Sequence, residues 1–370
     1  MARVILVLTA GFGDGHNTAA ASVADALRRE SLGEQVLVSD LVSEAQPSIS
    51  GILKSLYQVA ITHVPSAWKY LYKKLAKSDL DPAKNAWMRP LLTYLRQQLE
   101  TLQPRVIVST YPLYAGLLSC LREEMAVPPL VTVITDSTTV HPVWLMAPSD
   151  LYCVADLETD DVIVEMGVKR AETRITGFPV SLQFIEPLPE GALKPGVQRI
   201  LYLPSTPAKH VAATLAALRP LIQKGVRLTI PVGKHRSRLY HILRHYEDSL
   251  PAGSLDIIGW TNRIPELLRT HDVVICKAGG AILHEVMAAR TIPVIDYVVP
   301  GQEEGNADYL LTRNCALRSK TPQETGAAVA RLLENGGKLV RQMRENMLPI
   351  SVPDAAIRVA HEVLAVKKTP

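Results

Sequence analysis

Short apolar runs that alternate with longer amphipathic segments restrict most strongly how this chain of 370 residues can fold. Each run is rich in Val, Ile and Leu, does not alternate with polar residues, and is bounded by Pro, Gly, Asp or Thr. Such runs are typical of parallel strands that are buried on both faces of a sheet. The runs are Val4–Leu8, Val36–Val38, Val106–Val108, Leu130–Ile134, Leu151–Val154, Arg199–Leu203, Leu228–Ile230, Leu255–Ile258, Val273–Ile275 and Pro293–Ile295. The repeated order of strand and helix predicts an α/β fold with doubly wound sheets.

A stretch rich in Pro and Gly, within Phe178–Val197, interrupts this pattern near the middle of the chain. It lacks hydrophobic periodicity, as interdomain linkers do. Each flanking half opens with a strand, so we expect two Rossmann-like domains that face each other across a cleft. The predicted division is a first domain at 1–180, a linker at 181–197, a second domain at 198–353 and a C-terminal helix at 354–370 that could pack back on the first domain.

Charge and cysteine content exclude several classes of function. The formal charge of +4 is too small to indicate a nucleic-acid partner. That charge is unevenly spread, because residues 1–180 hold 16 Lys and Arg against 19 Asp and Glu, which leaves a net +7 in the rest. The four cysteines form no C-x-x-C pair and lie at no zinc spacing from His, so we expect no metal site and a reducing compartment. No run approaches the ~18–20 apolar residues of a membrane-spanning helix.

The first candidate site is the glycine-rich loop within Thr9–Asn17, which follows the first predicted strand and precedes a predicted helix. Gly11, Gly13 and Gly15 allow the backbone to turn tightly and to approach a bound group closely. His16 then stands at the N-terminus of the helix. The positive end of a helix lowers the pKa of an imidazole, which suits a neutral general base.

Two other interpretations of this loop stay open. One is a simple turn between strand and helix in which His16 is a capping residue. The other is a dinucleotide site, because Asp40 ends the second predicted strand about where an acid that binds ribose would stand. The spacing G-x-G-x-G-H nevertheless differs from the G-x-G-x-x-G of dinucleotide-binding loops.

A second segment, Ile134–Trp144, follows a buried strand of the first half and is expected at the same edge of the sheet. It brings Asp136, His141 and Trp144 close together, a combination that could bind a polar, hydroxylated ligand. The alternative is an Asx-type turn with His and Trp on a surface loop.

The second half carries groups suited to a nucleoside diphosphate. Gly279 and Gly280 lie between a predicted strand and a predicted helix, where backbone N–H groups form an anion cradle. Lys277 and Arg263 add positive charge for a diphosphate. Glu285, two turns into the helix, can accept hydrogen bonds from a ribose diol.

The next predicted strand ends in the loop Pro300–Asn306. Its Gln302, Glu303 and Asn306 carry amide and carboxylate groups that can bind sugar hydroxyls. Any one of these pieces could be an ordinary loop, but their occurrence after successive parallel strands favours a binding site.

The segment Leu53–Lys77 contains five lysines and no acid, and aromatic residues are interleaved with them. Basic and aromatic residues on an amphipathic helix suit an anionic membrane surface. The residues predicted to contact the membrane are Trp68, Lys69, Lys73 and Lys74. An ordinary surface helix with its lysines in water is the alternative.

Together these motifs resemble glycosyltransferase family 28, and within it the diacylglycerol glycosyltransferases: the bacterial processive diacylglycerol glucosyltransferases and the monogalactosyldiacylglycerol synthases. The resemblance covers almost the whole chain. The motifs that carry it are T-A-x-x-G-x-G-H at Thr9–His16, T-D-(x)4-H-(x)2-W at Thr135–Trp144, I-T-G-x-P-(x)3-F at Ile175–Phe184, K-x-G-G-(x)4-E at Lys277–Glu285 and P-G-Q-E-(x)2-N at Pro300–Asn306. The fold that the family implies is GT-B.

The resemblance also implies roles for residues of this chain. His16 resembles the general base and Asp136 the acid on the acceptor side. Glu285 resembles the ribose ligand, and Gln302 and Glu303 resemble the ligands of the sugar.

The remaining implied contacts concern the base and the lipid. The backbone near Trp260 would hold uracil, and the lipid acceptor would enter through 53–77.

Three departures from the family pattern affect the expected contacts. Gly11 stands where plant galactolipid synthases have Asp, and Ile282 and His284 replace hydroxyl-bearing residues. The segment Leu203–Pro207 replaces the glycine-rich loop that opens the donor domain. Phosphate contacts would therefore come from backbone amides, basic side chains, Ser205, Thr206 and His284.

The resemblance predicts an inverting, metal-independent transferase that moves a hexose from a UDP-sugar to diacylglycerol or a glycosyl-diacylglycerol. It needs no cofactor, since the UDP-sugar is a substrate. We expect it in the cytoplasm, peripheral on the inner face of the cell membrane. Three alternatives stay open: a UDP-N-acetylglucosamine transferase acting on a lipid-linked peptidoglycan precursor, a nicotinamide-dependent oxidoreductase, and a non-catalytic protein that binds nucleotide or lipid.

Overall fold

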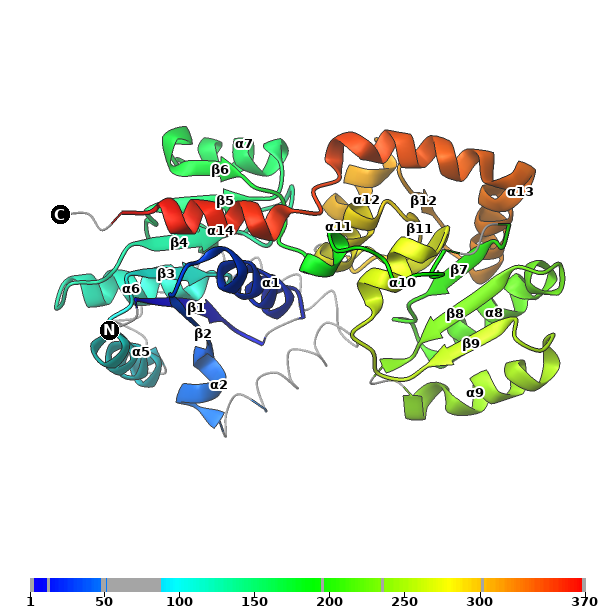
Figure 1. Cartoon of the computed structure of the whole chain (residues 1–370), viewed down its shortest axis with the longest axis horizontal. Coiled ribbons are helices and arrows are strands. Elements are labelled where there is room, and N and C mark those ends of the chain that lie inside the picture. Colours follow the sequence, from blue (N-terminus) through cyan, green and yellow to red (C-terminus); the bar gives the residue numbers. More distant parts are fainter. Residues whose placement is uncertain are drawn as a thin grey trace. The chain divides into compact units, whose positions relative to one another are not determined.

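The computed structural model describes residues 3–11, 14–47, 51, 88–193, 196–233, 236–300 and 303–367, which divide into two compact units. The first unit contains the chain up to Leu182 and the chain from Asp354 onwards. The second contains Gln183–Val299 and Glu303–Pro353. Each unit has a six-stranded sheet of its own (Figure 1).

All strands of the first sheet are parallel, in the order β2-β1-β3-β4-β5-β6. Its strands are β1 (Val4–Thr9), β2 (Gln35–Asp40), β3 (Val106–Ser109), β4 (Leu130–Val133), β5 (Leu151–Val154) and β6 (Thr173–Ile175). The helices of the unit are α1 (Asp14–Glu30), α2 (Leu41–Ala45), α5 (Arg89–Leu102), α6 (Leu113–Arg122), α7 (Leu157–Glu165) and α14 (Ala355–Ala365).

Strand β1 shows why the apolar runs do not alternate with polar residues. Ile5 and Val7 point to one face of the sheet, into a core that they share with α1 and α14. Leu6 and Leu8 point to the opposite face, into a second core with α5 and α6. Because helices cover both faces, both sets of side chains are buried, as a doubly wound sheet requires.

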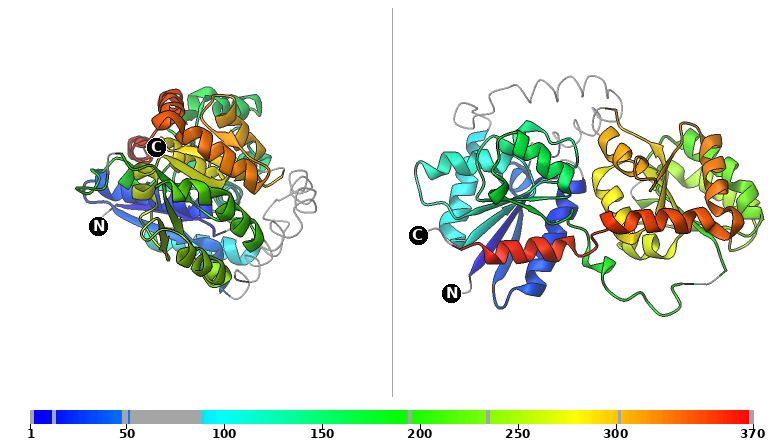
Figure 2. Two further views of the ribbon diagram at one scale, coloured as in Figure 1. Left: turned by 90° about the vertical axis from the view of Figure 1, so that its right-hand side faces the viewer. Right: turned by 90° about the horizontal axis from the view of Figure 1, so that it is seen from above.

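The C-terminal helix α14 belongs to the first unit and packs against α1 (Figures 1 and 2). Ala356, Val359 and Val363 repeat at the spacing of one helix face and lie in the core shared with β1. Polar contacts at the rim support the packing, since Nε2 of His361 lies 3.1 Å from a carboxylate oxygen of Glu30.

The second sheet is also parallel, in the order β12-β11-β10-β7-β8-β9. Its strands are β7 (Arg199–Tyr202), β8 (Arg227–Pro231), β9 (Leu255–Ile258), β10 (Val273–Lys277), β11 (Ile292–Tyr297) and β12 (Leu317–Arg318). The helices are α8 (Ala208–Gln223), α9 (Arg236–Ser249), α10 (Ile264–Thr270), α11 (Gly280–Ala289), α12 (Glu304–Leu311) and α13 (Pro322–Met347).

The predicted α/β architecture is confirmed, because each apolar run coincides with a parallel strand. Two strands lie outside the predicted runs, the edge strands β6 and β12.

Candidate active site

His16 lies in the first turn of α1, directly beyond the end of β1. Its Nδ1 atom is 2.9 Å from the carbonyl oxygen of Thr110 and 2.8 Å from Oγ1 of Thr135. A carbonyl oxygen only accepts hydrogen bonds, so Nδ1 carries the proton and Nε2 keeps a lone pair. Among the described residues none is a hydrogen-bond partner of Nε2, which is the arrangement that a general base needs.

The protonation of His16 is set by opposing influences. Burial lowers the pKa of the imidazole below its ordinary value, while the negative charge of Asp136 and the hydrogen bond to Thr110 raise it. Burial is the largest of the three, so the ring is neutral near neutral pH. Asp136 would stabilise the imidazolium that forms when the ring takes up a proton.

Aromatic rings enclose the imidazole of His16 on two sides. The ring of Tyr111 meets it edge-on with a centroid distance of 5.1 Å, and the indole of Trp144 lies 6.0 Å away. The same indole donates from Nε1 to Oδ2 of Asp136 at 2.8 Å, and the backbone N–H of His141 donates to the same oxygen at 3.3 Å. The structure therefore places the His16 and Asp136 motifs in one cluster.

These groups come together because of the order of the strands. β1, β3 and β4 are neighbours in the first sheet, and the carboxyl end of each is followed by part of the cluster. The segment after β3 supplies Thr110 and Tyr111, neither of which was predicted from the sequence. They follow a buried strand as the predicted motifs do, so their position alone was a usable signal.

Several predicted acceptor-side residues have mainly internal contacts. Trp144, in a short 3-10 helix at Pro142–Leu145, is only 1% exposed, and Nδ1 of His141 accepts from the N–H of Val143. Gly15 is partly buried in the first turn of α1. Gly13 lies outside the described residues, as do Trp68, Lys69, Lys73 and Lys74.

In the second unit, two helix N-termini lie beyond adjacent strands. α8 follows β7 and α11 follows β10, and these two strands pair in the sheet. The N-cap residues are Pro207 and Gly279, and neither helix has a side-chain cap. Their first N–H groups are therefore available to an anion at this edge of the sheet. Gly280 is the first residue of α11.

An ion pair lies beside Gly279, the N-cap residue of α11. Nζ of Lys277 lies 2.9 Å from Oε1 of Glu303, whose Oε2 accepts from the N–H of Val299 at 3.0 Å. A Cβ atom at Gly279 would meet Cε of Lys277 at 3.1 Å, so glycine leaves room for this pair. Asn306 donates from Nδ2 to the carbonyl oxygen of Ala278, which ties α12 to the same loop.

Two titratable side chains of α11 have strongly shifted pKa values. Burial raises the pKa of the Glu285 carboxyl to about 7 and lowers the pKa of the His284 imidazole to about 3. His284 is therefore neutral near pH 7, and about half of Glu285 is ionised there.

The other predicted donor residues differ in their exposure. Trp260 is 74% exposed, and the guanidinium of Arg263 is held by Glu266 in a bidentate pair with distances of 2.9 and 2.7 Å. Ser205 is exposed, whereas Thr206 is 2% exposed and turns its hydroxyl into the protein interior. Gln302 lies outside the described residues.

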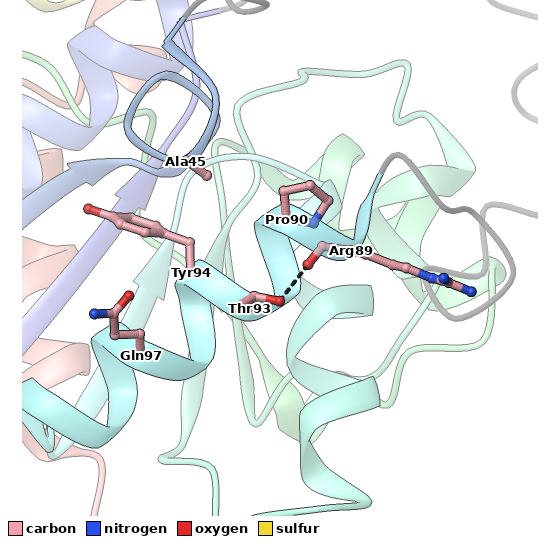
Figure 3. Close-up of a pocket in the computed structure, with 6 residues that line it drawn as sticks. All are labelled: Ala45, Arg89, Pro90, Thr93, Tyr94 and Gln97. Atoms are coloured by element: carbon pink, nitrogen blue, oxygen red, sulfur yellow. Dashed lines mark hydrogen bonds between the residues drawn. The ribbon is translucent and has the colours of Figure 1, made fainter.

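A surface hollow of about 520 Å³ lies between α2 and α5 in the first unit (Figure 3). Ala45, Pro90 and Tyr94 are among its lining residues, and the close-up also shows the hydroxyl of Thr93 bonded to the carbonyl of Arg89. None of the predicted site residues lines it.

Within the described ranges, no three His, Cys, Asp or Glu side chains gather in a group that could hold a metal ion. No helix in the same ranges is both long and apolar enough to cross a membrane.

Known proteins resemble this chain both in the first unit and over nearly its whole length. A family model described as monogalactosyldiacylglycerol (MGDG) synthase matches residues 16–180. The processive diacylglycerol beta-glucosyltransferase of Bacillus mycoides (strain KBAB4) is 28% identical over 378 residues, covering 98% of this chain and 93% of the relative. The protein of the same name in Bacillus cereus (strain B4264) has the same identity and coverage.

Solved structures show the same fold at lower identity. MurG of Acinetobacter baumannii is 17% identical, with a TM-score of 0.62 over 98% of this chain and all of that one. The UDP-GlcNAc 2-epimerase of Neisseria meningitidis bound to UDP-GlcNAc is 12% identical, with a TM-score of 0.63 over 98% and 99% of the two chains. These likenesses confirm the GT-B fold. The family model over residues 16–180 and the near-full-length relatives support the resemblance of this chain to the diacylglycerol glycosyltransferase group of glycosyltransferase family 28.

Proposed function

We propose that this protein is an inverting glycosyltransferase that moves a hexose from a UDP-sugar to diacylglycerol or a glycosyl-diacylglycerol at a membrane surface. The observation that carries the chemistry is the hydrogen bond from Nδ1 of His16 to the carbonyl of Thr110, which leaves Nε2 free as a base. The names of the relatives support the lipid acceptor, because both are diacylglycerol beta-glucosyltransferases.

In the proposed reaction, Nε2 of His16 removes the proton of the acceptor hydroxyl. The acceptor oxygen forms a bond to the anomeric carbon while the bond from that carbon to the UDP oxygen breaks, so the configuration inverts. Asp136 stabilises the imidazolium, as its effect on the pKa of His16 indicates. General base catalysis of this kind contributes roughly 10²–10⁴-fold.

The second unit is proposed to bind the donor. The N-termini of α8 and α11, with Lys277, can hold the diphosphate and take up the charge of the leaving UDP without a metal. Ser205 supplies an exposed hydroxyl on the same edge, and the backbone of Thr206 can contribute an amide. Glu285 is assigned to the ribose diol.

The remaining donor contacts keep the assignments that the family resemblance implies. Gln302, Glu303 and Asn306 are proposed for the sugar hydroxyls. The uracil is placed near Trp260, and Arg263 and His284 border the phosphates.

The membrane contact is proposed from the sequence. Trp68, Lys69, Lys73 and Lys74 would bring the first unit to an anionic lipid surface on the cytoplasmic face of the cell membrane, and His141 and Trp144 would border the lipid headgroup.

Transfer of radiolabelled hexose from a UDP-sugar to diacylglycerol vesicles tests this function. We expect a labelled glycolipid with the parent protein and almost none with His16→Ala. Transfer to a lipid-linked peptidoglycan precursor in place of diacylglycerol would assign the alternative acceptor. Binding of UDP without transfer to either lipid would assign a non-catalytic protein.

A further inference from the structure

The loop that carries Asp136 turns at Thr138 through a backbone conformation that β-branched residues rarely adopt. Thr138 has a φ of 57°, in the left-handed region that favours glycine. The N–H of Thr139 donates to the carbonyl of Ser137 at 2.6 Å, so Thr138 is the centre of a three-residue turn. With a positive φ this is the strained form of the γ-turn, which persists only where its surroundings hold it.

A hydrogen bond to α7 holds the tip of this turn. The N–H of Thr138 donates to Oγ1 of Thr159 at 3.0 Å. A backbone N–H can only donate, so Oγ1 is the acceptor here and keeps its own proton for another partner. That proton goes to Oδ1 of Asp156 at 2.6 Å, and the backbone N–H of Thr159 donates to the same oxygen at 2.8 Å. Oγ1 of Thr159 is thus held in place by the residue that caps α7.

The helix that holds the turn is itself firmly packed against the loop. Thr159 is fully buried and Asp156 is 8% exposed. One turn further along α7, Ile163 lies in one apolar cluster with Val140 and Trp144. The same helix therefore supports the turn through a hydrogen bond and the later part of the loop through apolar packing.

The loop closes on itself at Asp136. The Oδ2 atom accepts from the backbone N–H of His141 at 3.3 Å and from the indole of Trp144 at 2.8 Å. Asp136 precedes the turn at Thr138, whereas both of its donors follow it. The turn therefore sets how the two arms of the loop meet, and with that the place of the carboxylate relative to His16.

We propose that Thr159 is a positioning residue, whose hydroxyl holds the strained turn at Thr138 and thereby fixes the carboxylate of Asp136 relative to His16. The first half, the holding of the turn, does not depend on a ligand. The second half, the effect on transfer, rests on the proposed function.

Amide hydrogen exchange of the full chain without ligand tests the first half. In the parent, the N–H of Thr138 should exchange at least about tenfold more slowly than in an unstructured chain. In Thr159→Val, which keeps the shape but removes the hydroxyl, it should exchange about tenfold faster than in the parent. Thr159→Ser keeps the hydroxyl and should stay within about threefold of the parent. The matched control is Thr325→Val, another fully buried threonine of a helix but in the second unit, which should keep the parental rate.

Transfer kinetics test the second half. In Thr159→Val we expect kcat to fall about 3–10-fold, with the KM for the UDP-sugar within about twofold because the donor is assigned to the second unit. The negative charge of Asp136 raises the pKa of His16, so a carboxylate that moves away should shift the acid limb of the pH–rate profile to lower pH. A merely structural role would lower stability without this shift.

Glycine at Thr138 provides a rescue. Because glycine adopts a positive φ without strain, the turn then no longer needs to be held. Adding Thr138→Gly to Thr159→Val should therefore recover most of the lost kcat and return the acid limb to its parental position. No recovery in this double variant would overturn the role of strain.

The other outcomes separate the two halves. Exchange of the Thr138 amide at the unstructured rate in the parent, or at the parental rate in Thr159→Val, overturns the holding of the turn. Faster exchange with unaltered kcat and pH profile overturns the positioning of Asp136. If the parent transfers no hexose, the proposed function is at fault, and exchange still decides the first half. Should Thr159→Val fail to fold, Thr159→Cys, whose thiol is a weak acceptor, takes its place in both measurements.

Discussion

The indole N–H of Trp144 and the Oδ2 atom of Asp136 are joined by a hydrogen bond of 2.8 Å. The bond fixes the carboxylate with a side chain that is itself almost completely buried, so Asp136 has little freedom to move. Its charge then acts on His16 from a fixed position, which favours the protonated ring at the moment of proton transfer. Trp144 is thus expected to act through Asp136.

His16→Ala is predicted to lower kcat by roughly 10²–10⁴-fold, since the proton of the acceptor hydroxyl loses its base. UDP affinity should stay at the parental value, because the donor is assigned to the second unit. Burial lowers the pKa of His16, so the acid limb of the parental pH–rate profile should lie below the ordinary histidine range and be absent from the variant.

The matched control for this prediction is His361→Ala, which removes an exposed histidine from α14. It should leave kcat unchanged. Equal activity of the His16 variant and the control would remove His16 from the mechanism.

Thr135→Val is predicted to lower kcat about 2–10-fold, which corresponds to the loss of one ordinary hydrogen bond to Nδ1 of His16. The acid limb should also move to lower pH or lose amplitude, because the imidazolium is less well stabilised. Thr132→Val, on the strand β4 that precedes Thr135 but bonded to Ser149, is the control. A shift in thermal stability alone, with an unaltered pH profile, would show that Thr135 is structural only.

Glu285→Ala is predicted to weaken UDP binding by about 1.5–3 kcal/mol, the usual value for a hydrogen bond to a charged group. Calorimetric titration with UDP measures it. Because the ionised carboxylate is the better acceptor and its pKa is about 7, the ratio of parental to variant affinity should rise between pH 6 and pH 8. A ratio near one at both pH values would place the ribose elsewhere.

The same carboxyl predicts a pH effect on stability. Its pKa rises from 4.5 in the unfolded chain to about 7 in the folded protein, so between these values the folded state binds more protons. The free energy of unfolding should therefore fall as the pH rises through this window. Urea unfolding of Glu285→Gln should lack this slope, while Glu345→Gln, at an exposed position on α13, should keep it.

Replacing Lys69, Lys73 and Lys74 by Glu is predicted to release the protein from anionic vesicles. Each basic residue near such a surface contributes about 1 kcal/mol, and the effect is screened by salt. Transfer to acceptor in a bilayer should slow, while transfer to acceptor in detergent should not. Sedimentation with vesicles at the parental level would mean that another surface meets the membrane.

The central strands were predictable from sequence because both of their faces are buried. The edge strands β2 and β9 also contain apolar runs and were predicted, whereas the short edge strands β6 and β12 were not. β6 reads Thr-Arg-Ile and β12 reads Leu-Arg, and each pairs on one side only, so neither needs a continuous apolar run.

The candidate site was predictable where it depends on residue types that form a distinctive motif. Glycines, His16 and the Asp136 motif stand out, whereas Thr110 acts through its backbone carbonyl, which every residue has.

The packing of α14 against α1 has a consequence for biosynthesis. The core beneath β1 takes Val359 and Val363 from α14, so the first unit cannot complete its hydrophobic core until the ribosome has translated the whole second unit. The helix that carries His16 would then consolidate last, although it is made first. A nascent chain would thus not hold His16 in its final position until α14 has been translated.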